Sequence, residues 1–131
     1  MKNLLLLALL PFAVSATEIP RDEDGKIERS HRTLVQFQKL NPCPSNGNET
    51  GACSGYVKDH IRPLCAGGHD AVENLKWSEL GYSKLRDKQE WQLCRELKKK
   101  FGTVKLDQPL VDLCVIIDNE DLALIKDICT K

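Results

Sequence analysis

The sequence predicts a small α+β domain held together by disulfides, with a leading helix before a β-hairpin and a C-terminal strand-helix extension. Three observations support this fold class. All six cysteines follow an apolar N-terminal stretch. Two short apolar segments on either side of Gly67-Gly68 are typical of strands joined by a turn. Apolar residues between positions 91 and 101 recur at helical spacing.

Residues 1–16 are predicted to be a secretory signal peptide. A single Lys2 precedes an apolar run that ends in the small residues Ser15 and Ala16. The run is too short to span a bilayer with an apolar core of about 30 Å, and no second apolar run follows. We therefore expect export to the periplasm or the extracellular space, and no membrane association of the mature chain.

The six cysteines are expected to form disulfides in the exported part of the chain, which is long enough for one domain with a modest core. We expect sequential pairing, although the sequence alone permits other connectivities. The expected pairs are Cys43 with Cys53, Cys65 with Cys94, and Cys114 with Cys129. Structural zinc is disfavoured because the chain has no close Cys-x-x-Cys pair.

The segment before the hairpin is predicted to contain a flexible leader, one helix and a loop. Residues 17–28 are polar and acidic, which is typical of a flexible leader. Ser30 can cap a helix over residues 31–40, and Asn41-Pro42 ends it. In the loop that follows, Asn48-Glu49-Thr50 matches a glycosylation sequon, which matters only in a host that glycosylates exported chains.

The predicted main domain, residues 29–104, contains the hairpin and the long helix. Residues 56–61 alternate as a strand does, and residues 74–77 can return antiparallel to it. The helix is expected to begin between positions 78 and 83. Residues 105–131 are predicted to be an extension packed on the same domain, with a strand over 108–117 and a helix over 119–129 capped by Asn119.

The dipeptide Asp59-His60 at the end of the first predicted strand is the candidate reaction centre. Phosphodiester hydrolysis needs a base to activate water and a positive centre to stabilise charge on the phosphate. His60 could act as the base, and Asp59 could hold a metal. Adjacent side chains of a strand point to opposite faces, so both can serve one substrate only at a strand end or a bulge.

Three spaced blocks extend this candidate site: Asp59-His60-Ile61-x-Pro63-Leu64, Gly67-Gly68-x-Asp70 and Asn74-Leu75-x-Trp77. Together they resemble the HNH, or ββα-metal, endonuclease family, over about residues 29–97. The resemblance implies that His60 is the general base and that Asp59 binds one divalent metal, Mg²⁺ or Mn²⁺. It also implies that Asn74 braces the loop that orients His60.

The chain departs from the family pattern at the last metal ligand. The family usually has His or Asn nine positions after the Asn, where this chain has Ser83. A serine hydroxyl is a poor direct ligand and would act through a bound water. His69 is either a replacement ligand or an exposed turn residue, and Asp70 either binds metal or makes a local turn hydrogen bond. Lys84 and Arg86 are expected to contact phosphates.

The basic residues of the long helix either hold phosphates of a nucleic-acid substrate or form a solvated helix end that the helix dipole favours. Eight basic and three acidic residues lie between positions 84 and 105, whereas acidic residues prevail from 107 onward, so the extension should pack away from the site or serve another partner. The leading hypothesis is an exported endonuclease that hydrolyses DNA, with RNA as a second candidate substrate, and with little sequence preference. The alternatives are a secreted binding module with an inactive HNH fold and a structural or inhibitory protein unrelated to nucleases.

Overall fold

The computed structural model describes residues 17–130, and the predicted signal peptide lies outside them. The fold is α+β, as predicted. Its elements in chain order are α1 (His31–Leu40), β1 (Tyr56–His60), η1 (Leu64–Ala66), η2 (Val72–Asn74), β2 (Leu75–Glu79), α2 (Leu80–Phe101), α3 (Leu110–Asn119) and η3 (Ala123–Cys129), where η denotes a 3-10 helix. No helix within residues 17–130 is long and apolar enough to cross a membrane.

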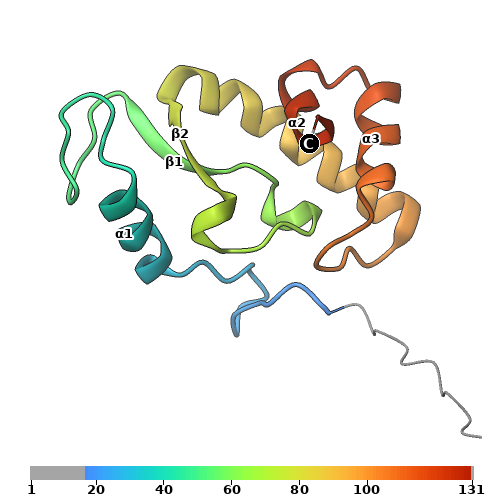
Figure 1. The fold of residues 1–131 in the computed structure, drawn as a ribbon. Coiled ribbons are helices and arrows are strands. Elements are labelled where there is room, and N and C mark those ends of the chain that lie inside the picture. The colour runs from blue at the N-terminus through green and yellow to red at the C-terminus, as the bar shows by residue number, and fades with distance from the viewer. Residues whose placement is uncertain (1–16, 131) are drawn as a thin grey trace, which may run out of the picture.

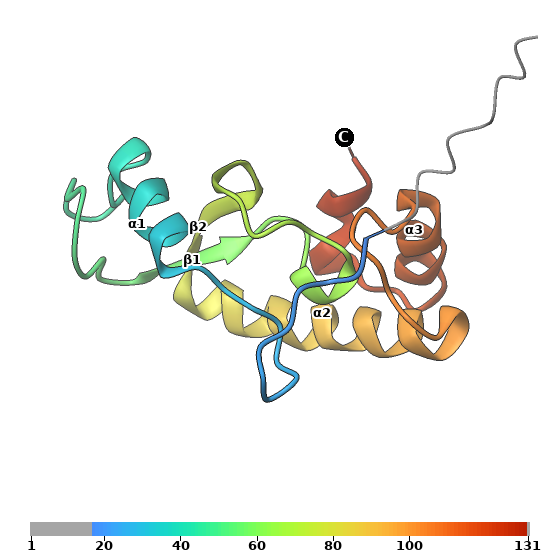
Figure 2. The ribbon, with the colours of Figure 1, turned by 90° about the horizontal axis from the view of Figure 1, so that it is seen from below.

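Strands β1 and β2 form an antiparallel two-stranded sheet between α1 and α2 (Figure 1). The register places Tyr56 opposite Glu79 and His60 opposite Leu75. On the α1 side, the rings of Trp77 and Phe37 lie 5.6 Å apart between centroids. Helix α2 packs on the other face and then continues beyond the hairpin (Figure 2). The hairpin is therefore fixed from both sides.

Helix α1 has the predicted limits, and its ends are capped as the sequence indicates. The Ser30 hydroxyl accepts a hydrogen bond of 3.3 Å from the backbone N–H of Thr33. At the other end, the backbone N–H of Asn41 donates to the carbonyl of Phe37. The side chain of Trp77 donates to the carbonyl of Asn41 at 2.7 Å, which attaches β2 to the end of α1.

The three disulfides confirm the predicted sequential pairing. Cys65–Cys94 joins the loop after β1 to α2, Cys114–Cys129 joins α3 to η3, and Cys43–Cys53 closes the loop after α1. The main core lies between α2, α3 and η3. Its fully buried apolar residues are Ala66, Leu93, Leu97, Leu113, Ile117 and Ile125.

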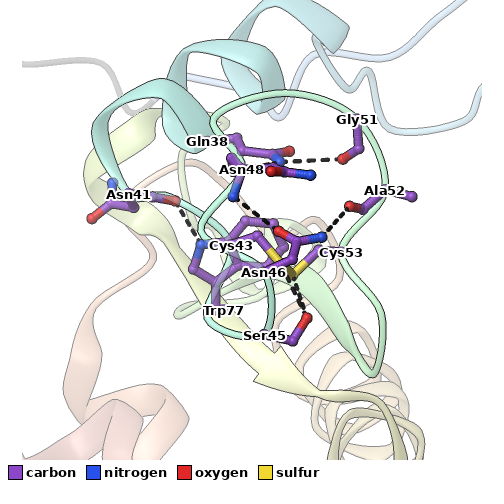
Figure 3. Close-up of a disulfide and its surroundings, with 10 residues drawn as sticks. All are labelled: Gln38, Asn41, Cys43, Ser45, Asn46, Asn48, Gly51, Ala52, Cys53 and Trp77. Atoms are coloured by element: carbon purple, nitrogen blue, oxygen red, sulfur yellow. Dashed lines mark hydrogen bonds between the residues drawn. A yellow bond between two sulfur atoms is a disulfide. The ribbon is translucent and has the colours of Figure 1, made fainter.

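The loop closed by Cys43–Cys53 is also held by side-chain hydrogen bonds (Figure 3). The buried Gln38 of α1 donates to the carbonyls of Asn48 and Gly51, at 3.1 and 3.2 Å. Asn46 donates to the carbonyl of Ala52 at 3.1 Å. These contacts satisfy backbone carbonyls that a loop without regular structure would otherwise leave to water.

The predicted C-terminal strand is wrong, and the predicted helix over 119–129 is present only as the shorter 3-10 helix η3 (Ala123–Cys129). Residues 110–119 form helix α3 instead of a strand, and Asn119 ends that helix instead of capping the next one. Leu113, Ile116 and Ile117 are spaced by three and four residues, so one helical face buries all three. Packing of that face against α2 outweighs the β-preference of a branched apolar run.

The leader has a defined course along the domain, although the sequence predicts a flexible segment. The backbone of Glu18 forms an isolated antiparallel β-bridge with that of Lys105, and a second such bridge joins Arg21 to Ile27. Ile19 is 8% exposed, so this apolar side chain provides an anchor within an otherwise polar segment. The polar composition of residues 17–28 obscured that single anchor.

Candidate functional site

Asp59 and His60 are the last two residues of β1, so both lie at one end of the hairpin. Their side chains point to opposite faces of the sheet, as expected for neighbours in a strand. Asp59 pairs in register with Lys76, on the face that meets α2 and η3. His60 pairs with Leu75, on the face that carries Trp77 and α1.

The Asp59 carboxylate has a buried oxygen without a hydrogen-bond partner. Its Oδ2 atom is buried and unbonded within the described chain. Two carboxylates of α2 lie near it, those of Asp87 and Glu90. Burial raises the pKa of both, and the negative charge of Asp59 raises each pKa further, against the opposing effect of Arg86. An uncompensated oxygen beside further carboxylates favours a bound cation.

The residues around Asp59 fit Mg²⁺ better than a metal held entirely by protein. Ser83 is 4% exposed on α2, one helical turn before Asp87. Among residues 17–130, no three His, Cys, Asp or Glu side chains are grouped so that they could hold a metal ion. Mg²⁺ requires only one or two carboxylates, because water and substrate phosphates complete its coordination. Asp59 supplies one such carboxylate.

His60 is fixed by a carboxylate on the other face of the hairpin. Its Nε2 atom lies 3.0 Å from Oδ1 of Asp70, and the His60 side chain is 12% exposed. The second oxygen of Asp70 accepts a hydrogen bond of 2.5 Å from the backbone N–H of Ser30. With Nε2–H donating to the carboxylate, the lone pair of Nδ1 is left to take a proton.

Asn74 holds the loop that separates His60 from Asp70. Its Oδ1 accepts from the backbone N–H of Arg62 at 2.9 Å. Its Nδ2 donates to the carbonyls of Arg62 and His69, at 2.9 and 2.8 Å. The backbone of Gly68 lies very close to that of Arg62 and to the Asn74 side chain. A β-carbon on Gly68 would lie 2.2 Å from the Arg62 carbonyl oxygen and 2.9 Å from Asn74 Nδ2. Only glycine fits at that position.

Of the two predicted phosphate contacts, only Lys84 is exposed. Arg86 is fully buried, which contradicts its predicted role. Its Nε donates to Glu90 and its Nη1 to Asp127, both at 2.8 Å, while Nη2 donates to the carbonyl of Ile61 at 2.9 Å. The Arg86 guanidinium is thus bonded to the C-terminal segment and not free to contact a phosphate. Asp127 of that segment also pairs with Lys76 at 3.2 Å.

His69 is not joined to Asp59 or His60. It lies 2.9 Å from Asp107 and is 52% exposed, as an exposed turn residue would be. The partners that the sequence did not reveal are Asp70 for His60 and the α2 carboxylates for Asp59. A signal existed for the latter, because Asp87 and Glu90 follow Ser83 by four and seven residues and so share its helical face.

Comparisons with known proteins gave no family for this chain. No family model matches the sequence, and no significant match was found among curated proteins or solved structures. The resemblance to HNH endonucleases therefore rests on the spaced sequence blocks.

Proposed function

We propose that the chain is a metal-dependent endonuclease that hydrolyses phosphodiester bonds in DNA, with RNA as a second candidate substrate. The observation that carries this proposal is the buried, unpartnered Oδ2 of Asp59, one residue before a histidine whose ring is fixed. A buried carboxylate oxygen without a partner costs folding free energy unless a ligand compensates it. A divalent cation is the ligand that suits this oxygen and its acidic surroundings.

Each residue of the proposed site has a distinct task. Asp59, with Ser83, would hold the metal, which when bound supplies positive charge against the phosphate. His60 takes a proton from the attacking water at Nδ1, and Asp70 keeps the imidazole ring in place through Nε2. Because His60 ends β1, a phosphodiester that crosses the tip of the hairpin can meet both Asp59 and His60.

The substrate would be recognised through its backbone. The contacts proposed at Asp59, His60 and Lys84 are with phosphate groups and the attacked phosphorus, which every nucleotide presents equally. The hydrolysis would therefore show little sequence preference. This property suits an exported enzyme that meets nucleic acid of any origin.

Cleavage of a supercoiled plasmid with Mg²⁺ or Mn²⁺ tests the proposal. The mature chain should convert the plasmid to nicked and linear forms, and His60→Ala should lose at least a hundred-fold in rate, since a general base contributes roughly 10²–10⁴-fold. His31→Ala is the matched control, because His31 is exposed in the first turn of α1. Equal cleavage by wild type and His60→Ala, or none by wild type with either metal, would refute the proposal.

A binding module without turnover is the second candidate function. The buried Ser83 favours it, because a hydroxyl replaces the imidazole or amide that would complete the metal site in the HNH pattern. Such a module would bind nucleic acid or protein but show no saturable Mn²⁺ binding that depends on Asp59. Metal titration therefore separates the two candidates without an activity assay.

A further inference from the structure

A line of exposed basic residues with one tryptophan runs along the outer face of α2. Positions in this line are separated by four, three, four and three residues, so they stack on one side of the helix. Trp91, at its centre, is 62% exposed. We call this line the α2 stripe. Its members, all exposed, are Lys84, Lys88, Trp91, Arg95 and Lys98.

The charges of the α2 stripe are not neutralised within the described part of the chain. The ion pairs and side-chain hydrogen bonds between residues 17 and 130 involve none of its five members. Lys84 and Lys88 place like charges one turn apart, which disfavours the helix. The helix dipole favours cations only near the C-terminal end, so it accounts for Lys98 but not for Lys84 or Lys88.

The α2 stripe also connects with the candidate site. Lys84 follows Ser83 directly, so one end of the stripe begins beside the proposed metal position. Further along, Trp91, Arg95 and Lys98 form one wall of a groove that also contains Asp70. The leader also lines this groove, and its course past α2 can be followed in Figure 2. Its ionisable residues in the groove carry both signs: Glu18, Arg21, Asp22, Lys26, Glu28 and Arg29.

We propose that the α2 stripe binds a single-stranded segment of nucleic acid and leads it to the candidate site. Four unpaired cations spread over about 21 Å of helix complement a line of phosphates. An exposed indole among them offers a flat surface on which an unstacked base can lie. In a duplex the base faces are already stacked, so the stripe should prefer single strands. This inference rests on the proposed function and names the form of nucleic acid that α2 binds best.

Fluorescence anisotropy with a labelled oligothymidylate in EDTA tests the inference, because binding is then measured without hydrolysis. Trp91→Ala should weaken binding roughly ten-fold or more, as loss of a stacked base does. Trp91→Phe should retain most of the affinity. Lys88→Ala should weaken binding and lower the salt slope by about 0.7 for one lost phosphate contact. Lys126→Ala is the matched control, an exposed lysine of η3.

Unchanged affinity in Trp91→Ala, or equal affinity for a duplex of the same length, would overturn the inference. The outcome is separable from that of the proposed function. If wild type binds the oligonucleotide through Trp91 but cleaves nothing with Mg²⁺ or Mn²⁺, the proposed hydrolysis is refuted and the proposed binding by the α2 stripe is supported. If plasmid cleavage depends on His60 while Trp91→Ala binds as wild type does, only the proposed binding by the α2 stripe is refuted.

Discussion

Asp127, near the end of the described chain, accepts a hydrogen bond of 2.8 Å from Nη1 of Arg86, whose side chain has no solvent exposure. The pair joins η3 to the middle of α2. Arg86 also donates to Glu90 of its own helix and to the carbonyl of Ile61 after β1. One guanidinium therefore connects the C-terminal segment, the long helix and the end of the candidate strand.

Replacing Arg86 should destabilise the whole domain. Arg86→Leu removes all of these hydrogen bonds and leaves Glu90 half-buried without its partner. The loss of one member of a buried ion pair costs about 3–5 kcal/mol in free energy of unfolding. Urea unfolding measures this cost, with the exposed Lys84→Ala as a control that should change little. A loss below about 1 kcal/mol would contradict the account of Arg86 as a structural residue.

The Asp127 contact should also make stability depend on pH in the acid range. Burial alone would raise the pKa of Asp127, but the hydrogen bonds from Arg86 and Lys76 outweigh it and lower the pKa below 3.8. The carboxylate therefore stabilises the fold above pH 3.8, and this stabilisation is lost as the pH falls through the lowered pKa. Urea denaturation at pH 6 and pH 3 should show that the free energy of unfolding falls less with acid in Asp127→Asn than in wild type. Equal losses would show that Asp127 is not linked to folding.

Two glycines provide opposite tests of backbone packing. Gly68→Ala places a β-carbon 2.2 Å from the Arg62 carbonyl oxygen, so the loop held by Asn74 must shift. We expect lower stability and weaker cleavage. At Gly81, in the first turn of α2, a β-carbon meets nothing within 4 Å. Gly81→Ala should raise the free energy of unfolding by up to about 1 kcal/mol. Thermal unfolding of both variants measures these changes in stability. An unchanged melting temperature in Gly68→Ala would contradict the close approach of Gly68 to the Arg62 carbonyl.

Asp70 is expected to act on catalysis through His60. Asp70→Leu removes the acceptor for His60 Nε2 while keeping a similar size, so kcat should fall by about ten-fold or more. The KM should change little, because both carboxylate oxygens of Asp70 are bonded to His60 and Ser30. Asp70→Asn keeps an acceptor oxygen and should recover part of kcat. Steady-state cleavage measures both constants, and a change confined to KM would exclude a positioning role.

Local signals in the sequence were sufficient for the parts of the fold that local interactions determine. The cap at Ser30 and the Pro42 stop each act within a few residues, and α1 follows from them. The two strand segments pair as predicted. Residues 61–74 join them through two 3-10 helices, and Gly67 ends the first of these helices instead of forming a tight hairpin turn. The C-terminal helix did not follow, because a branched apolar run such as Val115-Ile116-Ile117 suits either a strand or a helix. Packing against α2 decides between them.

Long-range partners decided the roles that the sequence left undetermined. Arg86 and Asp127 are separated by 41 positions, and nothing near Arg86 shows that a distant carboxylate buries it. The contact of Asp70 with Ser30 spans 40 positions and sets the direction of the His60 ring. The identity of Asp59 and His60 as candidates came from sequence. Their placement on opposite faces of one strand end came only from the fold.

The most direct test of the proposed metal site is a titration of the mature chain with Mn²⁺, followed by electron paramagnetic resonance. Wild type should bind one equivalent saturably. Asp59→Asn should abolish that binding, and it should also raise the free energy of unfolding without metal by about 1 kcal/mol, because it removes a buried unpaired charge. Asp118→Asn, an exposed carboxylate, is the matched control. Equal saturable binding by wild type and Asp59→Asn, or none by wild type, would contradict the account.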